Sequence, residues 1–414
     1  MVKLTADFGL SGLIENYIEE LFNEKKVSAP TRKKLWSHYF SKLSDAVDVG
    51  YSKKLNFYDE ELAESLKLNI AEFSAFKETS FKNEIESLLT QDGHLTPKSE
   101  FKKEALKISD DYNYRWIETE RHQTIANAQS AAKWKDFERN VELYPNLKIV
   151  GVNDSRRRAE HKYFDGVVRP FNDPFWDSHM TPLDWGCRCD VIQTDEDITE
   201  IPGGLQLKIE FENNPGKTGK IFGGSAYEDN ISKKEVQDAK ATAKKNYENE
   251  VLTKPREKQF KTVFEDKTGG KVNEHLLTTK GDDHKEIVSL SKEFAKKGKL
   301  VDILPEINEK EKDVRKKIFP KLLSDKSNPD IKVGNIYFDL KRPSAIKNIV
   351  GNANKASKQG AVAIISDSKL DKELTGKIMD ERAKDIFNDK NYHFDKVYFY
   401  KDKKLVEYNR TGGK

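Results

Sequence analysis

Residues 328–343 constrain the fold more tightly than any other stretch, because they predict one particular β-hairpin. Two short β-prone runs flank Gly334 and Asn335, a pair typical of a two-residue turn. The register that this turn imposes places Asp330 opposite Asp339 on the neighbouring strand. Two carboxylates ~5 Å apart destabilise a sheet unless something neutralises them. A divalent cation held by carboxylate oxygens would do so, and the hairpin therefore predicts a metal site.

Alternation along the second strand predicts which side chains accompany the metal. Asp339 and Lys341 share one face, while Ile336, Phe338 and Leu340 take the other. The lysine would orient an attacking water or stabilise the charge that develops on a phosphoryl group. The backbone carbonyl of Leu340 lies between the two and could complete the inner shell of the metal.

A solvated surface hairpin is the alternative explanation for the same residues. Lys332 and Lys341 would then pair with the two aspartates, each pair contributing ~0–1 kcal/mol. A Pro-Asp pair followed by Asp-x-Lys is also short enough to occur by chance. The conjunction favours a site, because an acidic residue, Glu286, begins a preceding helix and a buried strand follows.

Composition restricts the class of protein. The chain has 414 residues, with 36% hydrophobic and 35% charged, which predicts a polar protein of about two or three domains. No stretch approaches the ~18 apolar residues of a membrane span, and the N-terminus lacks the apolar core of a signal peptide. We therefore expect synthesis in a host cytoplasm. A net charge of +3 does not by itself indicate nucleic-acid binding.

Periodicity predicts a multidomain chain with a mostly α N-terminal arm, an α+β middle domain and an α/β C-terminal domain. Helical stripes dominate the arm, with helices expected over 59–91 and 97–139. Leu205, Leu207, Ile209 and Phe211 alternate as in a strand, and a solvent-facing charged helix is expected over 231–254. The predicted parts are 1–114 (arm), 115–200 (middle domain), 201–270 (strand and linker) and 271–414 (C-terminal domain).

Residues 145–200 lose helical periodicity and become rich in Asp, Arg, His, Pro and aromatic residues. The ordered set resembles the Mu F-like phage head morphogenesis domain over about 115–195: Thr119-Glu120, His161, Asp165-Gly166, Asp173-Pro174-Phe175-Trp176, and Pro182 followed by Trp185-Gly186-Cys187-Arg188-Cys189. That family more often has Asn in the place of Gly186. The resemblance implies a minor capsid component of tailed-phage heads, associated with the portal and with packaged or ejected DNA.

Cys187 and Cys189 are the two cysteines of the chain, so there is no disulfide framework. With His161, and His179 near, they offer ligands that zinc prefers. On a strand, one intervening residue puts both sulfurs on the same side. The alternative is that the thiols are small buried hydrophobes, while His161 and Asp173 satisfy backbone groups of a turn-rich domain.

The C-terminal part alternates helices and strands. A helix is expected over 284–297 with Gly298 as its cap, then a strand over 300–304 and the hairpin, then a helix over 346–358 and a buried strand over 361–365. A closing hairpin is expected over 394–408. With Pro305-Glu306 and Pro329-Asp330, this order resembles the PD-(D/E)XK nuclease superfamily over about 284–366, and most of all the C-terminal toxin nucleases of contact-dependent inhibition proteins, which act mainly on tRNA.

The nuclease resemblance implies a role for each matching residue. Asp330, Asp339, Glu286 and the Leu340 carbonyl would hold Mg²⁺ or Mn²⁺, and the two aspartates, Glu286 and Lys341 would be catalytic. Lys355 and Gln359, one turn apart on the later helix, would face the nucleic-acid backbone. Most superfamily members have Glu where this chain has the shorter Asp339.

Together these observations predict a phage or prophage head protein that carries a metal-dependent endonuclease toxin domain. Its expected partners are portal and capsid proteins, tRNA or DNA as substrate, and a cognate immunity protein, and its expected location is the virion. The alternatives are a purely structural head protein with a non-catalytic C-terminal interaction domain, an inactive nuclease-like or nucleic-acid-binding module, and an unrelated fold.

Overall fold

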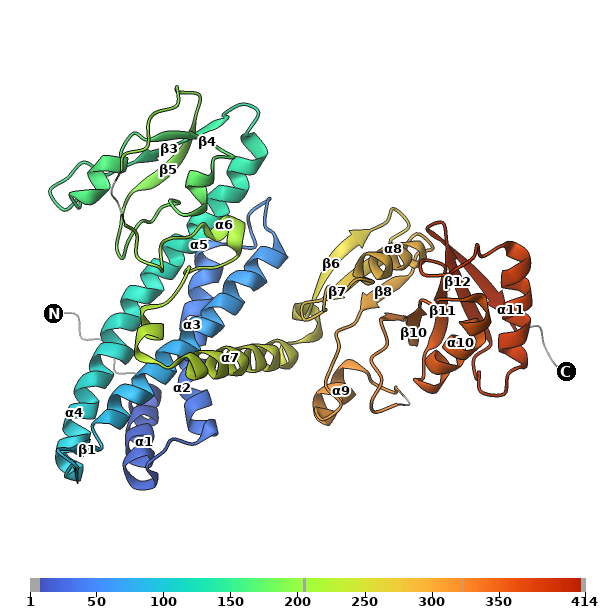
Figure 1. Cartoon of the computed structure of the whole chain (residues 1–414), viewed down its shortest axis with the longest axis horizontal. Coiled ribbons are helices and arrows are strands. Elements are labelled where there is room, and N and C mark those ends of the chain that lie inside the picture. The colour runs from blue at the N-terminus through green and yellow to red at the C-terminus, as the bar shows by residue number, and fades with distance from the viewer. Residues whose placement is uncertain (1–7, 204–205, 323, 411–414) are drawn as a thin grey trace. The chain divides into compact units, whose positions relative to one another are not determined.

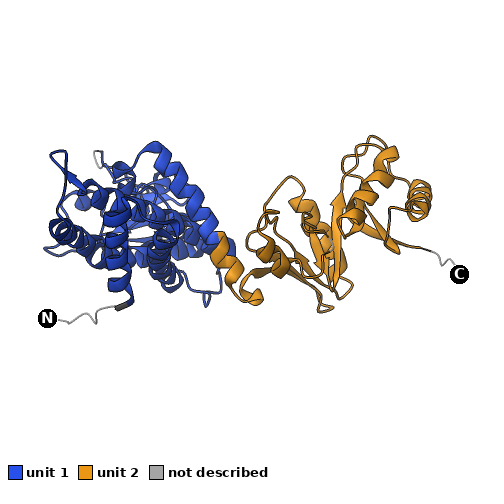
Figure 2. Ribbon diagram, turned by 90° about the horizontal axis from the view of Figure 1, so that it is seen from below, with its two compact units in different colours: residues 1–247 blue, residues 248–414 orange. Residues whose placement is uncertain are grey.

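The computed structural model describes residues 8–203, 206–322 and 324–410. The chain divides into two compact units, unit 1 (residues 1–247) and unit 2 (residues 248–414), coloured separately in Figure 2. A helical N-terminal region, a small α+β part and a large C-terminal sheet follow one another along the chain (Figure 1). The predicted multidomain organisation is confirmed at this level. Among the described residues, none of the helices combines the length and apolarity of a membrane span.

Five long helices dominate unit 1: α1 (Phe8–Glu24), α2 (Ala29–Gly50), α3 (Glu60–Ser87), α4 (Lys98–Asp110) and α5 (Ile117–Asn140). The side chains of Ser28 and Asp59 cap the first turns of α2 and α3. A π-helical segment, η1 (Asp111–Trp116), joins α4 to α5, so the predicted helix over 97–139 is continuous but locally widened. The short strands β1 (Thr90–Gln91) and β2 (His94–Leu95) form a hairpin before α4.

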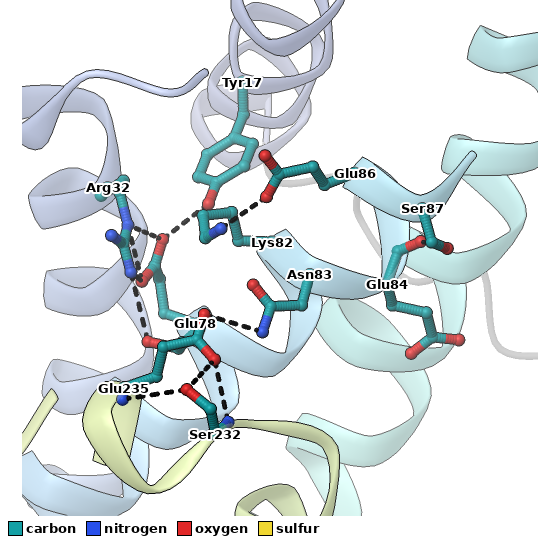
Figure 3. Close-up of polar contacts among 11 residues, drawn as sticks. Tyr17, Arg32, Glu78, Lys82, Asn83, Glu84, Glu86, Ser87, Ser232 and Glu235 are labelled. Carbon is teal, nitrogen blue, oxygen red and sulfur yellow. Dashed lines mark hydrogen bonds and ion pairs between the residues drawn. The ribbon is translucent and has the colours of Figure 1, made fainter. Parts of the chain in front are cut away.

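Polar contacts on α3 fasten three other segments to it (Figure 3). The buried carboxylate of Glu78 accepts hydrogen bonds from Tyr17 on α1 at 2.6 Å and from Arg32 on α2 at 2.7 Å. Asn83 donates at 3.1 Å to Glu235, which also accepts from the Ser232 hydroxyl at 2.8 Å. The helical arm is therefore held by buried charged groups as well as by its apolar stripes.

Glu235 belongs to α7 (Lys233–Thr253), which the sequence predicted to be a solvent-facing linker. That prediction is wrong for one face. Ala239, Ala243 and Tyr247 are buried, and the Tyr247 ring lies 5.9 Å from the ring of Phe40. These small residues recur every fourth position, and the surrounding lysines and glutamates hide the stripe in an average over the segment.

Gly50 lies at the end of α2, directly against α5. A β-carbon there would fall 2.6 Å from Cβ of Ala128 and closer still to the Ile125 carbonyl oxygen. We expect Gly50→Ala to lower the free energy of unfolding of unit 1 by about 1–3 kcal/mol, because backbone must move. All five tryptophans precede residue 248, so their fluorescence during denaturant unfolding of the full chain measures this unit. Gly12→Ala on α1, with no neighbour within 4 Å, is the control and should not destabilise it; equal losses would contradict the packing argument.

The rest of unit 1 surrounds a three-stranded antiparallel sheet with the order β4-β3-β5. Its elements are β3 (Asn146–Val150), η2 (Glu160–Phe164), β4 (Val168–Pro170), η3 (Pro174–Asp177), β5 (Asp190–Thr194), α6 (Pro215–Thr218) and η4 (Ala226–Asn230). Trp134 of α5 and Trp176 lie in its core.

The strand predicted from Leu205 to Phe211 is not present in the described residues 206–211, and Leu205 itself lies outside them. The Phe211 amide bonds the Lys208 carbonyl in a turn. Phe211 is buried 5.3 Å from the ring of Trp185, whereas Ile209 is exposed. One aromatic anchor, and not a sheet, therefore positions this segment.

An eight-stranded sheet with the order β13-β12-β11-β10-β9-β8-β7-β6 forms unit 2. Its strands are β6 (Phe260–Glu265), β7 (Lys271–His275), β8 (Leu300–Ile303), β9 (Ile331–Val333), β10 (Ile336–Lys341), β11 (Val362–Ser366), β12 (Lys396–Lys401) and β13 (Lys404–Asn409). The pairs β7–β8, β10–β11 and β11–β12 are parallel. Because β6 pairs with β7, the sheet includes a strand that lies before residue 271, the predicted start of the C-terminal domain.

Helices cover both faces of this sheet. They are η5 (Arg256–Lys258), α8 (His284–Ala295), α9 (Lys312–Ile318), η6 (Ile346–Asn348), α10 (Ile349–Lys358) and α11 (Gly376–Asn388). On one face, Leu290 and Phe294 of α8 pack with Phe338. On the other, Ala353 of α10 packs with Ile365. Gly298 follows α8 with a φ of +72°, as expected of its cap.

His275 on β7 is buried with both ring nitrogens in use. Its Nδ1 accepts from the Leu277 amide at 3.1 Å, so Nε2 donates to Gln259 at 3.2 Å. Burial, and then the charge of Arg256, lower its pKa to about 4. A depressed pKa means that this stabilisation is present above about pH 6.5 and is lost as the pH falls toward 4, up to about 3 kcal/mol.

We therefore expect hydrogen-exchange protection of β7 in the full chain to fall between pH 6.5 and 4 more steeply in the wild type than in His275→Asn. His393→Asn, at an exposed position of the same unit, should follow the wild type. Parallel curves for wild type and His275→Asn would contradict the assignment.

Candidate functional site

The β9–β10 hairpin has the predicted register, with Val333 opposite Ile336 and Ile331 opposite Phe338. The regular pairing ends there, and the predicted alignment of Asp330 with Asp339 is wrong by one position. The Asp330 amide instead bonds the Phe338 carbonyl at 3.1 Å. The cause lies outside the hairpin, because the Asp330 carbonyl accepts the amide of Leu304, just after β8, at 2.9 Å.

The carboxylate of Asp330 faces the second strand. Its Oδ2 accepts the backbone N–H of Leu340 at 2.5 Å. The structure thus shows the amide of Leu340 in contact with the predicted metal ligands, while the predicted role of the Leu340 carbonyl stays a prediction. Asp330 both stabilises the hairpin and points its carboxyl toward Asp339.

Asp339 and Lys341 share a face, as predicted, next to Ala363 and Ile365 of β11. Asp339 is 4% exposed, and its Oδ2 lies 2.6 Å from Nζ of Lys341. The lysine also donates to Oε1 of Gln359, the residue after α10, at 3.2 Å. The ammonium group is therefore held beside the buried carboxylate from two sides.

Burial raises the pKa of Asp330, and the charge of Asp339 raises it further. Burial also raises the pKa of Asp339, against the opposing effect of Lys341. Two adjacent carboxyl groups of this kind share a proton more readily than they carry two charges. A divalent cation satisfies the same pair of groups with oxygen ligands.

Glu286, the predicted third acid, lies apart from the two aspartates. It is on α8, which covers the face of Phe338, whereas Asp339 and Lys341 take the opposite face. Its carboxylate accepts hydrogen bonds from Ser366 and, at 3.0 Å, from Ser368. Within the described residues, Glu286 does not join the aspartates in a group of three acids.

Two charged contacts near this site were not predicted. Arg342, directly after Lys341, donates to Asp282 at 2.9 Å and to Asp283 at 3.0 Å. They join the end of β10 to the start of α8. Consecutive aspartates before a helix were the available signal, but their partner depends on the sheet topology. Lys355, predicted to contact substrate, is exposed on α10.

A second cluster, His161, Cys187 and Cys189, lies in unit 1. Nδ1 of His161 is 3.4 Å from Sγ of Cys187 and 3.9 Å from Sγ of Cys189. Helix η2 presents the buried histidine, and a turn through Gly186 presents the sulfurs. Gly186 has a φ of +67°, which Gly and Asn adopt most readily, and this accounts for Asn in the resembling family.

The sulfurs also contact each other's residues. The Cys189 amide donates to Sγ of Cys187 at 3.4 Å. A hydrogen bond from the Cys189 thiol lowers the pKa of Cys187 to about 5, while that same bond and burial raise the pKa of Cys189.

The other two candidates near this cluster have structural roles. His179 stacks on Phe175 at 4.4 Å between ring centroids and bonds Ser178 at 2.8 Å. Asp173 caps η3 through the Phe175 amide and pairs with Arg169 at 2.5 Å. For Asp173 the alternative interpretation, satisfaction of backbone groups, is confirmed.

Comparison with known proteins places a relationship in unit 1. Residues 96–192 match the family described as Phage Mu protein F like protein. The Mu-like prophage FluMu F protein of Haemophilus influenzae is 42% identical over 82 residues, which is 20% of this chain and 19% of the relative. The putative capsid assembly protein F of Escherichia phage Mu is 36% identical over 64 residues, or 16% of this chain and 15% of the relative.

The match with these two relatives thus spans less than one fifth of their own length. It covers the helices α4 and α5, the small sheet as far as β5 and the His-Cys-Cys cluster, and it stops before unit 2. No solved structure matches the chain.

Proposed function

We propose that this chain is a two-part phage protein: unit 1 takes part in head morphogenesis, and unit 2 is a metal-dependent nuclease. The first half of the proposal is supported by the match of residues 96–192 and by the printed description of the phage Mu relative as a putative capsid assembly protein. Portal and capsid proteins are then its partners, and the virion its location.

The observation that carries the second half is the buried group formed by Asp330, Asp339 and Lys341. Oxygen ligands from two carboxyl groups fit Mg²⁺ or Mn²⁺, and the adjacent ammonium fits a phosphate. The divalent ion would polarise the scissile phosphate and lower the pKa of a bound water. The position of the pair at the end of a hairpin, between parallel strands and helices on both faces, agrees with the resemblance to PD-(D/E)XK nucleases.

The side chains have separate tasks in this proposal. Asp330 and Asp339 supply the metal-binding oxygens. Lys341, held by Gln359, donates to the phosphate oxygens and stabilises the negative charge of the transition state. Lys355 contributes positive charge for the nucleic-acid backbone from the exposed side of α10. Glu286 acts, if at all, through water.

Transfer RNA is the proposed substrate because the resemblance is greatest to toxin nucleases that act on it, and DNA is the alternative. A nuclease of this kind would require a cognate immunity protein in the producing cell. The resemblance, and not the hairpin, carries this part of the proposal.

A second candidate function is a structural head protein whose unit 2 is a non-catalytic interaction domain. The observation in its favour is that Glu286 bonds Ser366 and Ser368 away from the aspartates. The Asp330 carboxylate also has a structural partner in the Leu340 amide.

Cleavage by the full-length protein distinguishes the two functions. Purified protein is incubated with tRNA or plasmid DNA in Mg²⁺, in Mn²⁺ or in chelator. We expect metal-dependent cleavage, with tRNA preferred. A folded protein that cleaves neither substrate in either metal would favour the interaction domain.

The head role has an independent test. The gene is deleted from the phage or prophage that encodes it, and particles are examined by electron microscopy and mass spectrometry. We expect the protein in wild-type heads and defective head assembly in the deletion. Normal infectious particles that lack the protein would contradict this role and leave the nuclease proposal untouched.

A further inference from the structure

We propose that His161, Cys187 and Cys189 bind one zinc ion, independently of the nuclease hairpin in unit 2. One ligand atom from each residue lies within 4.8 Å of the other two. In the described parts of the chain, this is the one group of three His, Cys, Asp or Glu residues with that property. Thiolate and imidazole are the ligands that zinc prefers.

The separations within the cluster fit tetrahedral zinc. Bonds of about 2.3 Å to sulfur and about 2.0 Å to nitrogen, at the tetrahedral angle, place S and N about 3.5 Å apart. The observed separations from His161 Nδ1 are 3.4 Å to Cys187 and 3.9 Å to Cys189. Both sulfurs thus face the same ring nitrogen, and the three atoms need only small movements to share an ion.

The surroundings support a bound ion with thiolate ligands. His161 is 4% exposed, and its carbonyl accepts a hydrogen bond from Arg157. The N–H of Cys189 donates to Sγ of Cys187 at 3.4 Å, a contact that stabilises a metal-bound sulfur. These bonds fix the histidine and one sulfur before any ion is present.

A zinc ion here would have a structural purpose. Residues 151–189 contain η2, β4 and η3 but no long helix or strand. Linking η2 to the segment just before β5 would restrain this turn-rich stretch, whose ends are joined by few backbone ladders.

The described residues provide three protein ligands, so the fourth position is left to water. A cavity of about 100 Å³ borders the cluster and provides room for it. The exposed guanidinium groups of Arg156 and Arg188 line this cavity. They disfavour a second cation and are compatible with a neutral zinc site formed by two thiolates and one imidazole.

The test is the metal content of the full chain purified under reducing conditions without an affinity metal. We expect about one zinc per chain in the wild type and in His122→Ala, an exposed histidine of the same matched segment. Cys187→Ser, Cys189→Ser and His161→Ala should each lose most of it. Less than about 0.1 zinc per wild-type chain after incubation with zinc, or full zinc content in the Cys187→Ser/Cys189→Ser double variant, would overturn the proposal.

Because these variants could fail to fold, the wild type is also tested alone. Zinc is removed with a chelator, and Co²⁺ is then titrated into the protein. We expect a sulfur-to-cobalt charge-transfer band that saturates at one equivalent, and a fall in the unfolding temperature on zinc removal on the order of 5 °C that zinc reverses. No band, or two free thiols with an unchanged unfolding temperature, would contradict the site, as would a Cys187–Cys189 disulfide in the native protein.

Discussion

Replacing Asp339 by asparagine is expected to reduce metal-dependent cleavage by the full-length protein on the order of 10²–10³-fold. The asparagine keeps the shape of the side chain but removes the anionic oxygen that the metal would share with Asp330. The substitution should cost little stability, because burial already raises the pKa of Asp339 and favours its neutral form. A loss of activity without unfolding therefore points to chemistry.

Matched variants separate this effect from a general loss of charge. Asp371→Asn, at an exposed position of unit 2, should cleave at the wild-type rate. Lys341→Met should lose activity to a similar extent as Asp339→Asn, since its ammonium lies 2.6 Å from that carboxylate. Hydrogen exchange of β10 verifies that each variant is folded. Wild-type cleavage by folded Asp339→Asn would contradict the proposed active site.

Replacing Lys77 by methionine is expected to lower the free energy of unfolding of unit 1 by about 3–5 kcal/mol. Lys77 on α3 is fully buried, and its ammonium lies 2.8 Å from Glu120 of α5 and 2.9 Å from the Tyr227 hydroxyl. The rings of Tyr39 and Tyr112 surround the same ammonium, at 5.3 and 5.5 Å from their centroids. Methionine would leave the Glu120 carboxylate buried without a counter-charge.

The double variant Lys77→Met/Glu120→Gln tests that reason. Removing both charges should restore most of the lost stability, because no uncompensated charge remains. Lys82→Met is the control, since its ion pair with Glu86 is partly exposed and should contribute less than about 1 kcal/mol. Tryptophan fluorescence during denaturant unfolding reports on unit 1 for all of them. A double variant less stable than either single variant would contradict the ion-pair account.

Local sequence predicted the hairpin but not its last pair. Gly334 and Asn335 determine the turn, and alternation then assigns Asp339 and Lys341 to one face, as observed. The slip at Asp330 comes from its bond to Leu304 after β8, which no pattern within the hairpin contains. The tertiary arrangement of strands made that decision.

The same limit explains Glu286. Its helix was predicted correctly, but the face of the sheet that a helix covers depends on chain connectivity, and here α8 lies opposite the side of Asp339. Helix α7 shows the reverse case, because its buried stripe of Ala239, Ala243 and Tyr247 was present in the sequence but obscured by charge. Glu120, noted only as part of a motif, proved to be a buried partner of Lys77.

Anomalous diffraction from crystals of the full-length protein soaked in Mn²⁺ tests the central claim most directly. The account predicts one strong manganese peak between the carboxylates of Asp330 and Asp339, and its absence in Asp339→Asn crystals of the same form. A folded hairpin with no peak at these aspartates at saturating Mn²⁺, or with Lys341 still occupying the position between them, would contradict the assignment of unit 2 as a metal-dependent nuclease.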